Sequence, residues 1–281
     1  MQPHELKDVI ALIRKEASNL IQYLETLGDD DWEKQSACED WTVAEVVGHM
    51  IFVFKDVCYD GVSRGLTGDI SPPEGFPDPE NLIDATRHRI ISDIAKRHTR
   101  ELGSELLTML ESHAEAVCKL WDTLTPANWD TQCYRMAGIR PAHTFISTPI
   151  TETAMHHWDI RSRISPRSAY LSSESMHYFM QSISQGNYFN RGEVLAATLR
   201  YRFNLGKTEP YTLDFIITGD SVSTELNSNA APHDTFYCDE ETLALLLYGR
   251  LSAGQAIKLG KISWEGKIES FMEFNRWYHG G

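Results

Sequence analysis

Three side chains have the types and spacing of a divalent-metal site. Glu152 and His156 are four residues apart, so on a helix they project from the same face, one turn from each other. His49 lies within an otherwise apolar segment, where an imidazole buried without a partner would be costly. Two histidines and one carboxylate leave positions open for water or substrate, as in catalytic metal sites. We therefore predict one divalent metal, zinc by default, with nickel, iron or manganese as alternatives.

Two neighbours of this trio have more than one interpretation. Asp159 follows His156 by about one helical turn, where it would orient the imidazole or simply face solvent. His157 is a competing ligand, but it points about 100° away from His156 around the helix, and we assign it to packing. A Glu-x-x-x-His pair also arises by chance, and a histidine within a helix is often a hydrogen-bonded core residue. A bundle without metal therefore remains the alternative.

The elements that must position these residues are helical. Thr42, followed three residues later by Glu45, forms a capping box that begins the helix carrying His49. Thr148 as cap and Pro149 in the first turn begin the helix carrying the other two ligands. We expect helices at about residues 5–27, from 42 to at least 54, at 80–124 (one long or one broken helix) and at 148–163, four in all. Mostly local connections between them predict a four-helix bundle over residues 1–165.

A long segment rich in glycine and proline separates the second and third helices. It runs from Asp60 to Pro79. Loops of this length are often lids or binding loops, so we expect it to border the metal pocket. An inert surface excursion is the alternative.

After Pro166 the pattern changes to a mixture of strands and helices. Residues 198–205 alternate polar and apolar side chains, which predicts a strand with Arg200 and Arg202 on its polar face. Further strands are expected at residues 211–217, 235–238 and 261–264, and helices at 173–185, 243–248, 252–259 and 268–277. The predicted fold class is therefore a two-domain α+β protein, with a small α+β domain at residues 166–281.

The composition argues against several classes of binding partner. The formal net charge is −14 and no basic run occurs, which argues against nucleic acid and anionic membranes. No stretch of 18 apolar residues exists, and the N-terminus does not resemble a signal peptide. The five cysteines form no CxxC pair, which is typical of reduced thiols. We expect a cytoplasmic protein with a small-molecule substrate.

The two metal-binding segments resemble a known superfamily. Residues 38–50, CEDWTVAEVVGHM, and residues 152–159, ETAMHHWD, are similar to motifs of the DinB-like superfamily, in particular its mycothiol-dependent maleylpyruvate isomerase branch. The resemblance covers residues from about 5 to 165. It implies that His49 is the first metal ligand and that Glu152 and His156 are the other two.

The C-terminal half resembles the sterol-carrier-protein-like fold. The resemblance lies in residues 239–252 and 256–266, and it implies that Arg250, after a leucine-rich helix, contributes to an active site. Arg200 or Arg202 would serve instead, and Arg250 also fits a simple cation at a helix C-terminus.

These resemblances imply a thiol-dependent isomerase or transferase that uses mycothiol or another low-molecular-weight thiol. In that mechanism the metal holds a thiolate and an arginine binds a small anionic electrophile. The long Gly/Pro segment and the length of the chain depart from the family and suggest a substrate other than maleylpyruvate. The alternatives are a metal-dependent hydrolase, lyase or cyclase of secondary metabolism, and a non-enzymatic carrier of a hydrophobic ligand.

Overall fold

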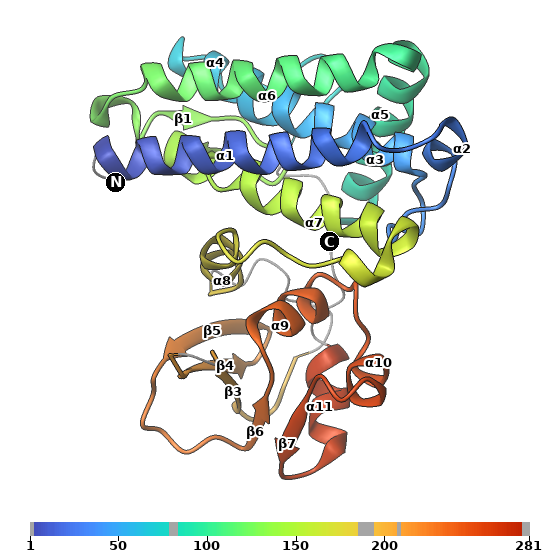
Figure 1. Ribbon diagram of the computed structural model, residues 1–281. Helices are drawn as coiled ribbons and strands as arrows, with labels where there is room; N and C mark the ends of the chain where they lie inside the picture. Colours follow the sequence, from blue (N-terminus) through green and yellow to red (C-terminus); the bar gives the residue numbers. More distant parts are fainter. Residues whose placement is uncertain (1–2, 79–83, 185–193, 207–208, 277–281) are drawn as a thin grey trace. The chain divides into compact units, whose positions relative to one another are not determined.

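The computed structural model describes residues 3–78, 84–184, 194–206 and 209–276. The chain divides into two compact units, Met1–Ser175 and Met176–Gly281 (Figure 1). Within the described residues, no helix is both long enough and apolar enough to cross a membrane.

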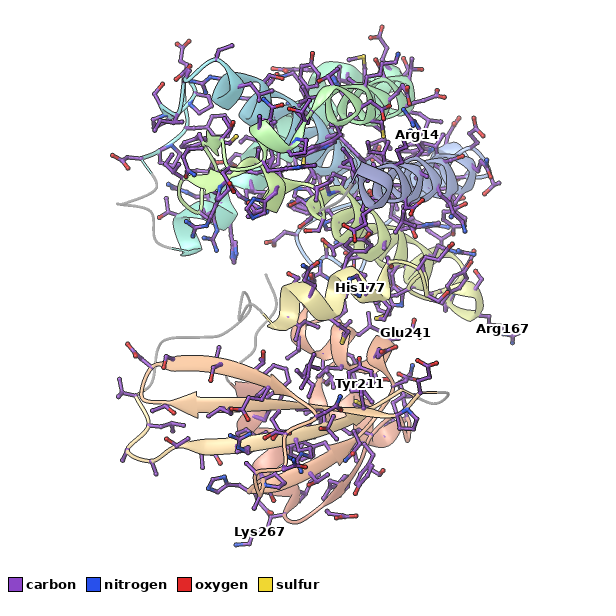
Figure 2. All side chains as sticks on the ribbon, turned by 90° about the vertical axis from the view of Figure 1, so that its left-hand side faces the viewer. Arg14, Arg167, His177, Tyr211, Glu241 and Lys267 are labelled. Atoms are coloured by element: carbon purple, nitrogen blue, oxygen red, sulfur yellow. The ribbon has the colours of Figure 1, made fainter. Side chains whose placement is uncertain are left out.

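The first unit is a helical bundle. Its helices are α1 (Pro3–Leu24), α2 (Asp29–Trp32), α3 (Val43–Phe52), α4 (Gly61–Leu66), α5 (Asp84–Leu102), α6 (Leu106–Thr123) and α7 (Thr148–Ile164). A π-helical segment, Val53–Asp60, joins α3 to α4. Helix α1 packs against α6 and α7, whereas α3 packs against α5, α6 and α7 (Figure 1). Arg14 of α1, which is labelled in Figure 2, also forms ion pairs with Glu115 and Asp122 of α6, at 3.1 and 3.3 Å.

The beginnings of the two site helices differ in how they are capped. The hydroxyl of Thr42 accepts a hydrogen bond from the Glu45 amide, and the Glu45 carboxylate accepts one from the Thr42 amide, so the predicted capping box is confirmed. At α7 the N-cap is Ser147, which makes no side-chain cap bond. Thr148 is already helical, so its predicted capping role is wrong. Pro149 lies in the first turn, where a backbone amide has no acceptor within the helix, so the absence of an N–H group in proline costs no hydrogen bond.

The Gly/Pro-rich segment is shorter than the sequence suggested. Helix continues to Leu66, so the irregular part begins only after it. Gly65 allows the helix to continue here. Any other residue would place its Cβ atom 2.7 Å from the Gln132 carbonyl oxygen. Two short strands that the sequence did not predict pass at this point, β1 (Gln132–Cys133) and β2 (Arg140–Pro141).

The helical region predicted at residues 80–124 is broken. Gly103 ends α5 with a φ of +50°, and a short 3-10 turn, Gly103–Glu105, leads into α6. Only a residue that tolerates positive φ fits this break at little cost.

The first unit also extends beyond the boundary expected at Pro166. Another 3-10 turn, Pro166–Ser168, follows α7, and the chain then returns to the bundle. The Arg161 side chain lies over the Tyr170 ring, and Lys15 of α1 pairs with Glu174. These contacts keep residues 166–175 with the bundle.

The second unit combines a five-stranded sheet with four helices in its described residues. The strands are β3 (Leu199–Leu205), β4 (Tyr211–Thr218), β5 (Ser221–Leu226), β6 (Asp234–Tyr237) and β7 (Ser263–Glu265). Their order is β5-β4-β3-β6-β7, with β3 and β6 parallel and the other neighbours antiparallel. The helices are α8 (Met176–Ser184), α9 (Glu240–Leu247), α10 (Ala253–Lys258) and α11 (Ile268–Arg276).

Aromatic rings form the core of this unit. Phe203 of β3, Phe215 of β4 and Phe236 of β6 are buried and contact Phe274 of α11. The sequence missed β5, most of whose residues are exposed and which therefore lacks an apolar face.

Candidate metal centre

The structure brings the three predicted ligands together. Oε2 of Glu152 lies 3.3 Å from Nε2 of His49 and 3.4 Å from Nε2 of His156. Both imidazoles are buried, and their ring centroids are 4.7 Å apart. Two nitrogen donors and one carboxylate oxygen thus converge from α3 and α7, which is a donor set that a divalent metal accepts.

Asp159 lies behind His156. Its fully buried Oδ2 accepts hydrogen bonds from His156 Nδ1, at 2.9 Å, and from the Cys38 thiol, at 3.1 Å. With Nδ1 bonded to Asp159, Nε2 is the nitrogen that faces Glu152, and it becomes available to a metal when its own proton is lost. This is the contact expected of a carboxylate that orients a metal-binding imidazole.

Cys38 and Trp41 complete the surroundings of the metal centre, although no role was predicted for either of them. The turn that carries them is closed by the Ser36 hydroxyl, which donates to the Trp41 carbonyl at 2.8 Å and accepts from the Cys38 amide at 3.1 Å. The Trp41 ring stacks on His49 with centroids 4.6 Å apart. The signal was present in residues 38–41, CEDW, directly before the capping box.

A second donor set shares one histidine with the first. Cys38, His156 and Asp159 also place a ligand atom each within 4.8 Å of one another. This set uses Nδ1 of His156, however, which already has Asp159 as its hydrogen-bond partner. The set of His49, Glu152 and His156 uses Nε2, and it leaves that hydrogen bond intact.

The charges at the centre are strongly coupled. Burial would raise the pKa of Glu152, but hydrogen bonds from His156 and His49 hold that pKa well below its usual range. Burial would lower the pKa of His156, but Asp159, Cys38 and Glu152 together raise it well above its usual range. The Glu152 carboxylate is therefore ionised and faces protons that the imidazoles can give up, an environment that also suits a cation.

His157 lies outside this centre, as its position on the helix predicted. Its ring lies 5.3 Å from that of Tyr23 of α1. Burial, together with the nearby charge of Arg161, lowers the pKa of His157 to about 4, so the ring is neutral at pH 7.

The end of the Gly/Pro-rich segment packs beside the His49 helix. The Phe76 ring stacks on Phe52 at 6.3 Å, and Phe52 lies 6.0 Å from the His49 ring. The Tyr134 hydroxyl donates to the Pro77 carbonyl at 2.8 Å. These contacts support the expected place of the segment next to the centre.

The three candidate arginines all belong to the second unit. Arg200 and Arg202 both form ion pairs with the buried Asp214, at 2.8 and 2.7 Å, and Arg200 also pairs with Glu225. These two guanidinium groups therefore have structural partners. Arg250 follows α9 and donates to the Tyr248 carbonyl at 2.7 Å, which is the helix-end contact considered as its alternative role.

Comparison with known proteins identifies the family of the helical unit. Residues 13–161, more than half of the chain, match the family model of the mycothiol maleylpyruvate isomerase N-terminal domain. The chain therefore belongs to this family. The matched region contains all three candidate ligands, together with Cys38 and Asp159.

Solved structures extend the likeness to both units. A mycothiol-dependent maleylpyruvate isomerase is 14% identical, covers 89% of this chain and 92% of its own, and has a TM-score of 0.57. A histidine-to-alanine mutant of that enzyme is 12% identical, covers 94% of this chain and 95% of its own, and has a TM-score of 0.58. The two-domain α+β fold expected from the sequence is thereby confirmed.

The C-terminal region has a further likeness. Sterol carrier protein 2 like 2 from Aedes aegypti is 15% identical and covers 37% of this chain and 95% of its own, with a TM-score of 0.29. No curated protein matches the sequence.

Proposed function

We propose that the protein is a metal-dependent isomerase or transferase that uses a small-molecule thiol and acts on a small anionic electrophile. The observation that carries this proposal is the convergence of His49, Glu152 and His156 on one point in the bundle. Membership of the mycothiol maleylpyruvate isomerase family supports the thiol, with mycothiol as the first candidate.

His49, Glu152 and His156 would hold the metal, with zinc as the first candidate. A divalent metal bound there supplies one thing to the chemistry, a lower pKa for a neighbouring thiol, so that a thiolate is present at neutral pH. The chain's own residues prepare the site for it. Asp159 keeps the proton of His156 on Nδ1, and the Trp41 ring shields one face of His49 from water.

The anionic end of the substrate requires a cation. We assign this role to Arg250, because the resemblance of residues 239–252 and 256–266 to the sterol-carrier-protein-like fold implies it; Arg200 and Arg202 form ion pairs with Asp214. A guanidinium binds a carboxylate through two parallel hydrogen bonds, which fixes the orientation of the substrate as well as its charge.

The test is a thiol-omission assay with the zinc-loaded full-length protein. Maleylpyruvate and related unsaturated dicarboxylates would be supplied with mycothiol, with another small thiol or with none. We expect turnover only with a thiol, and a loss of about 1,000-fold or more in His49→Ala. The exposed histidine variant His143→Ala should keep its activity. Full turnover without thiol would contradict the proposal and favour an enzyme that activates water at the same metal.

A further inference from the structure

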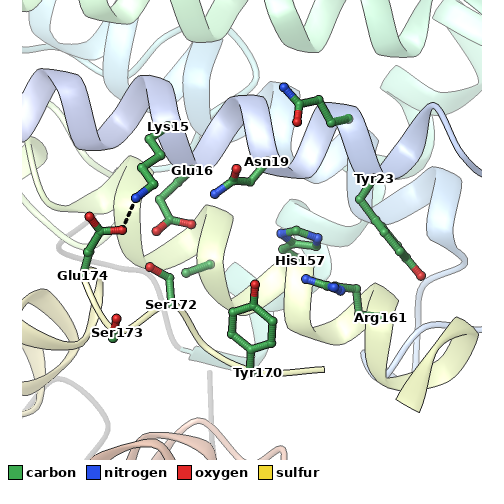
Figure 3. A pocket seen from close by; sticks show the side chains of 12 residues that line it. Lys15, Glu16, Asn19, Tyr23, His157, Arg161, Tyr170, Ser172, Ser173 and Glu174 are labelled. Atoms are coloured by element: carbon green, nitrogen blue, oxygen red, sulfur yellow. Dashed lines mark hydrogen bonds and ion pairs between the residues drawn. The ribbon is translucent and has the colours of Figure 1, made fainter. Parts of the chain in front are cut away.

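A second pocket lies in the first unit, between α1, α7 and the segment that follows α7 (Figure 3). Its volume is about 370 Å³, which is within the range of small-molecule sites. Glu16 and Asn19 project into it from α1, His157 and Arg161 from α7, and Tyr170 from the following segment (Figure 3). None of the three predicted metal ligands lines it.

Polar atoms buried in the wall of this pocket lack hydrogen-bond partners. They are Oε1 of Glu16, Nε2 of His157 and Nε of Arg161, when the described residues are considered. The Glu16 and His157 residues are only 2% and 8% exposed. Buried polar groups in native proteins are nearly always satisfied, so three such atoms around one hollow indicate a polar occupant.

Arg161 provides the charge for an anion. Its guanidinium lies over the rings of Tyr23 and Tyr170, with distances of 5.2 and 5.0 Å to their centroids. It forms no ion pair with any residue in the described part of the chain. Lys15, the other cation of the pocket, is already paired with Glu174. A guanidinium held between two rings is oriented in advance and presents its edge to a carboxylate.

Glu16 provides a hydrogen-bond acceptor that complements the positive charge of Arg161. Burial raises the pKa of its carboxyl group, and a hydrogen bond from Ser172 opposes that shift. The remaining oxygen is an acceptor for a hydroxyl group, as is the unpartnered ring nitrogen of His157 if its proton lies on Nδ1. An anion alone would satisfy Arg161 but would leave Glu16 and His157 without donors.

We propose that this pocket binds a small hydroxylated carboxylate, with its carboxylate on Arg161 and its hydroxyl groups toward Glu16 and His157. The site is separate from the metal centre and does not depend on the function proposed above. A pocket filled only by water is the competing explanation.

The test uses glycerate as probe, with propionate and glycerol as its two halves. Propionate has the carboxylate without hydroxyl groups, and glycerol has hydroxyl groups without the carboxylate. Binding to the full-length protein would be followed by titration in NMR spectra. We expect a Kd of about 1 mM for glycerate, a reasonable value for so few atoms, and at least tenfold weaker binding of both controls.

Three variants test whether glycerate binds in this pocket. Arg161→Gln should weaken glycerate at least tenfold, whereas Arg163→Gln, an exposed arginine on the same helix, should leave it unchanged. Tyr170→Ala should weaken it severalfold, and because Tyr170 is 58% exposed this variant should fold normally. Zinc content should be the same in all three variants. Glycerate binding no tighter than either control, or unchanged in both Arg161→Gln and Tyr170→Ala, would overturn the proposal.

Discussion

Buried carboxylates occur in both units of the molecule, but their partners differ. In the sheet, Asp214 is fully buried and receives hydrogen bonds from two arginines, at 2.7 and 2.8 Å. In the bundle, the buried Asp159 and the half-buried Glu152 face the imidazoles of His156 and His49. The first cluster uses guanidinium groups, which are always charged, and the second uses imidazoles, which can give up a proton and bind a metal through the freed nitrogen.

This difference separates a structural cluster from the cluster that we propose binds a metal. Two guanidinium groups saturate the oxygens of Asp214, and nothing in that cluster can be replaced by a ligand. An imidazole nitrogen, in contrast, gives up its proton and offers a lone pair to a metal. Substitutions in the bundle cluster should therefore affect metal and activity, and those in the sheet cluster should affect stability.

The largest effect is expected from His49→Ala. Loss of one of three ligands should reduce zinc from about one ion per chain to less than about 0.1, and turnover should fall about 1,000-fold or more. Elemental analysis and a steady-state assay measure both quantities, with His143→Ala as the matched control. Normal zinc content in His49→Ala would remove this residue from the site.

Asp214→Asn should act on stability alone. It leaves Arg200 and Arg202 without their shared charge, and removal of one partner from a buried ion cluster costs about 3 kcal/mol in free energy of unfolding. Urea denaturation is the measurement, and Asp220→Asn, in the exposed turn between β4 and β5, is the control. The zinc content should not change. A loss of zinc in Asp214→Asn would break the separation between the two clusters.

Asp159→Asn should weaken the metal site without abolishing it. The amide holds the imidazole less firmly and carries no charge, so the affinity for zinc should fall about 10- to 100-fold. Competition with a chelator of known affinity measures this, and Asp130→Asn, at a carboxyl group that is 93% exposed, is the control. Equal affinity in Asp159→Asn and the wild type would reduce Asp159 to a packing role.

The sequence predicted the convergence of His49, Glu152 and His156 better than it predicted their surroundings, because two of these residues follow helical spacing. Residues four apart on one helix must share a face, so Glu152 and His156 were paired without knowledge of the fold. The partner on α3 followed from the cost of burying His49. The same reasoning cannot place Cys38, because its contact with Asp159 depends on a turn closed by Ser36 rather than on a periodic element.

The predicted helix and domain boundaries differ from those in the structure where long-range packing overrides local signals. Glycines at positions 61 and 65 suggested a loop, but they allow a helix to pass close to the β1–β2 hairpin. Prolines and polar residues after position 166 suggested a linker, whereas contacts of Tyr170 and Glu174 with the bundle keep that segment in the first unit. Neither contact leaves a pattern in the local sequence.

Acid should affect the sheet cluster in a defined direction. Burial would raise the pKa of Asp214, but Arg202 and Arg200 lower it below its usual value. The unfolded chain, with a pKa of about 4, therefore takes up a proton first as the pH falls. The stabilisation is complete above the unfolded pKa and is lost as the pH falls through the folded pKa. Urea midpoints should converge between the wild type and Asp214→Asn below about pH 4, and a constant difference would contradict this assignment.

The smallest effect is expected from Phe76→Ala, which tests the border of the metal centre. Phe76 contacts Phe52 and Tyr134, and aromatic pairs of this kind contribute about 0.5–1.5 kcal/mol each. Without the ring, the end of the segment should be held less firmly beside α3, and kcat/KM should fall about 3- to 10-fold while zinc content is unchanged. Ile70→Ala, in the exposed part of the same segment, should leave kcat/KM unaltered. Equal values for both variants would make the segment an inert surface loop.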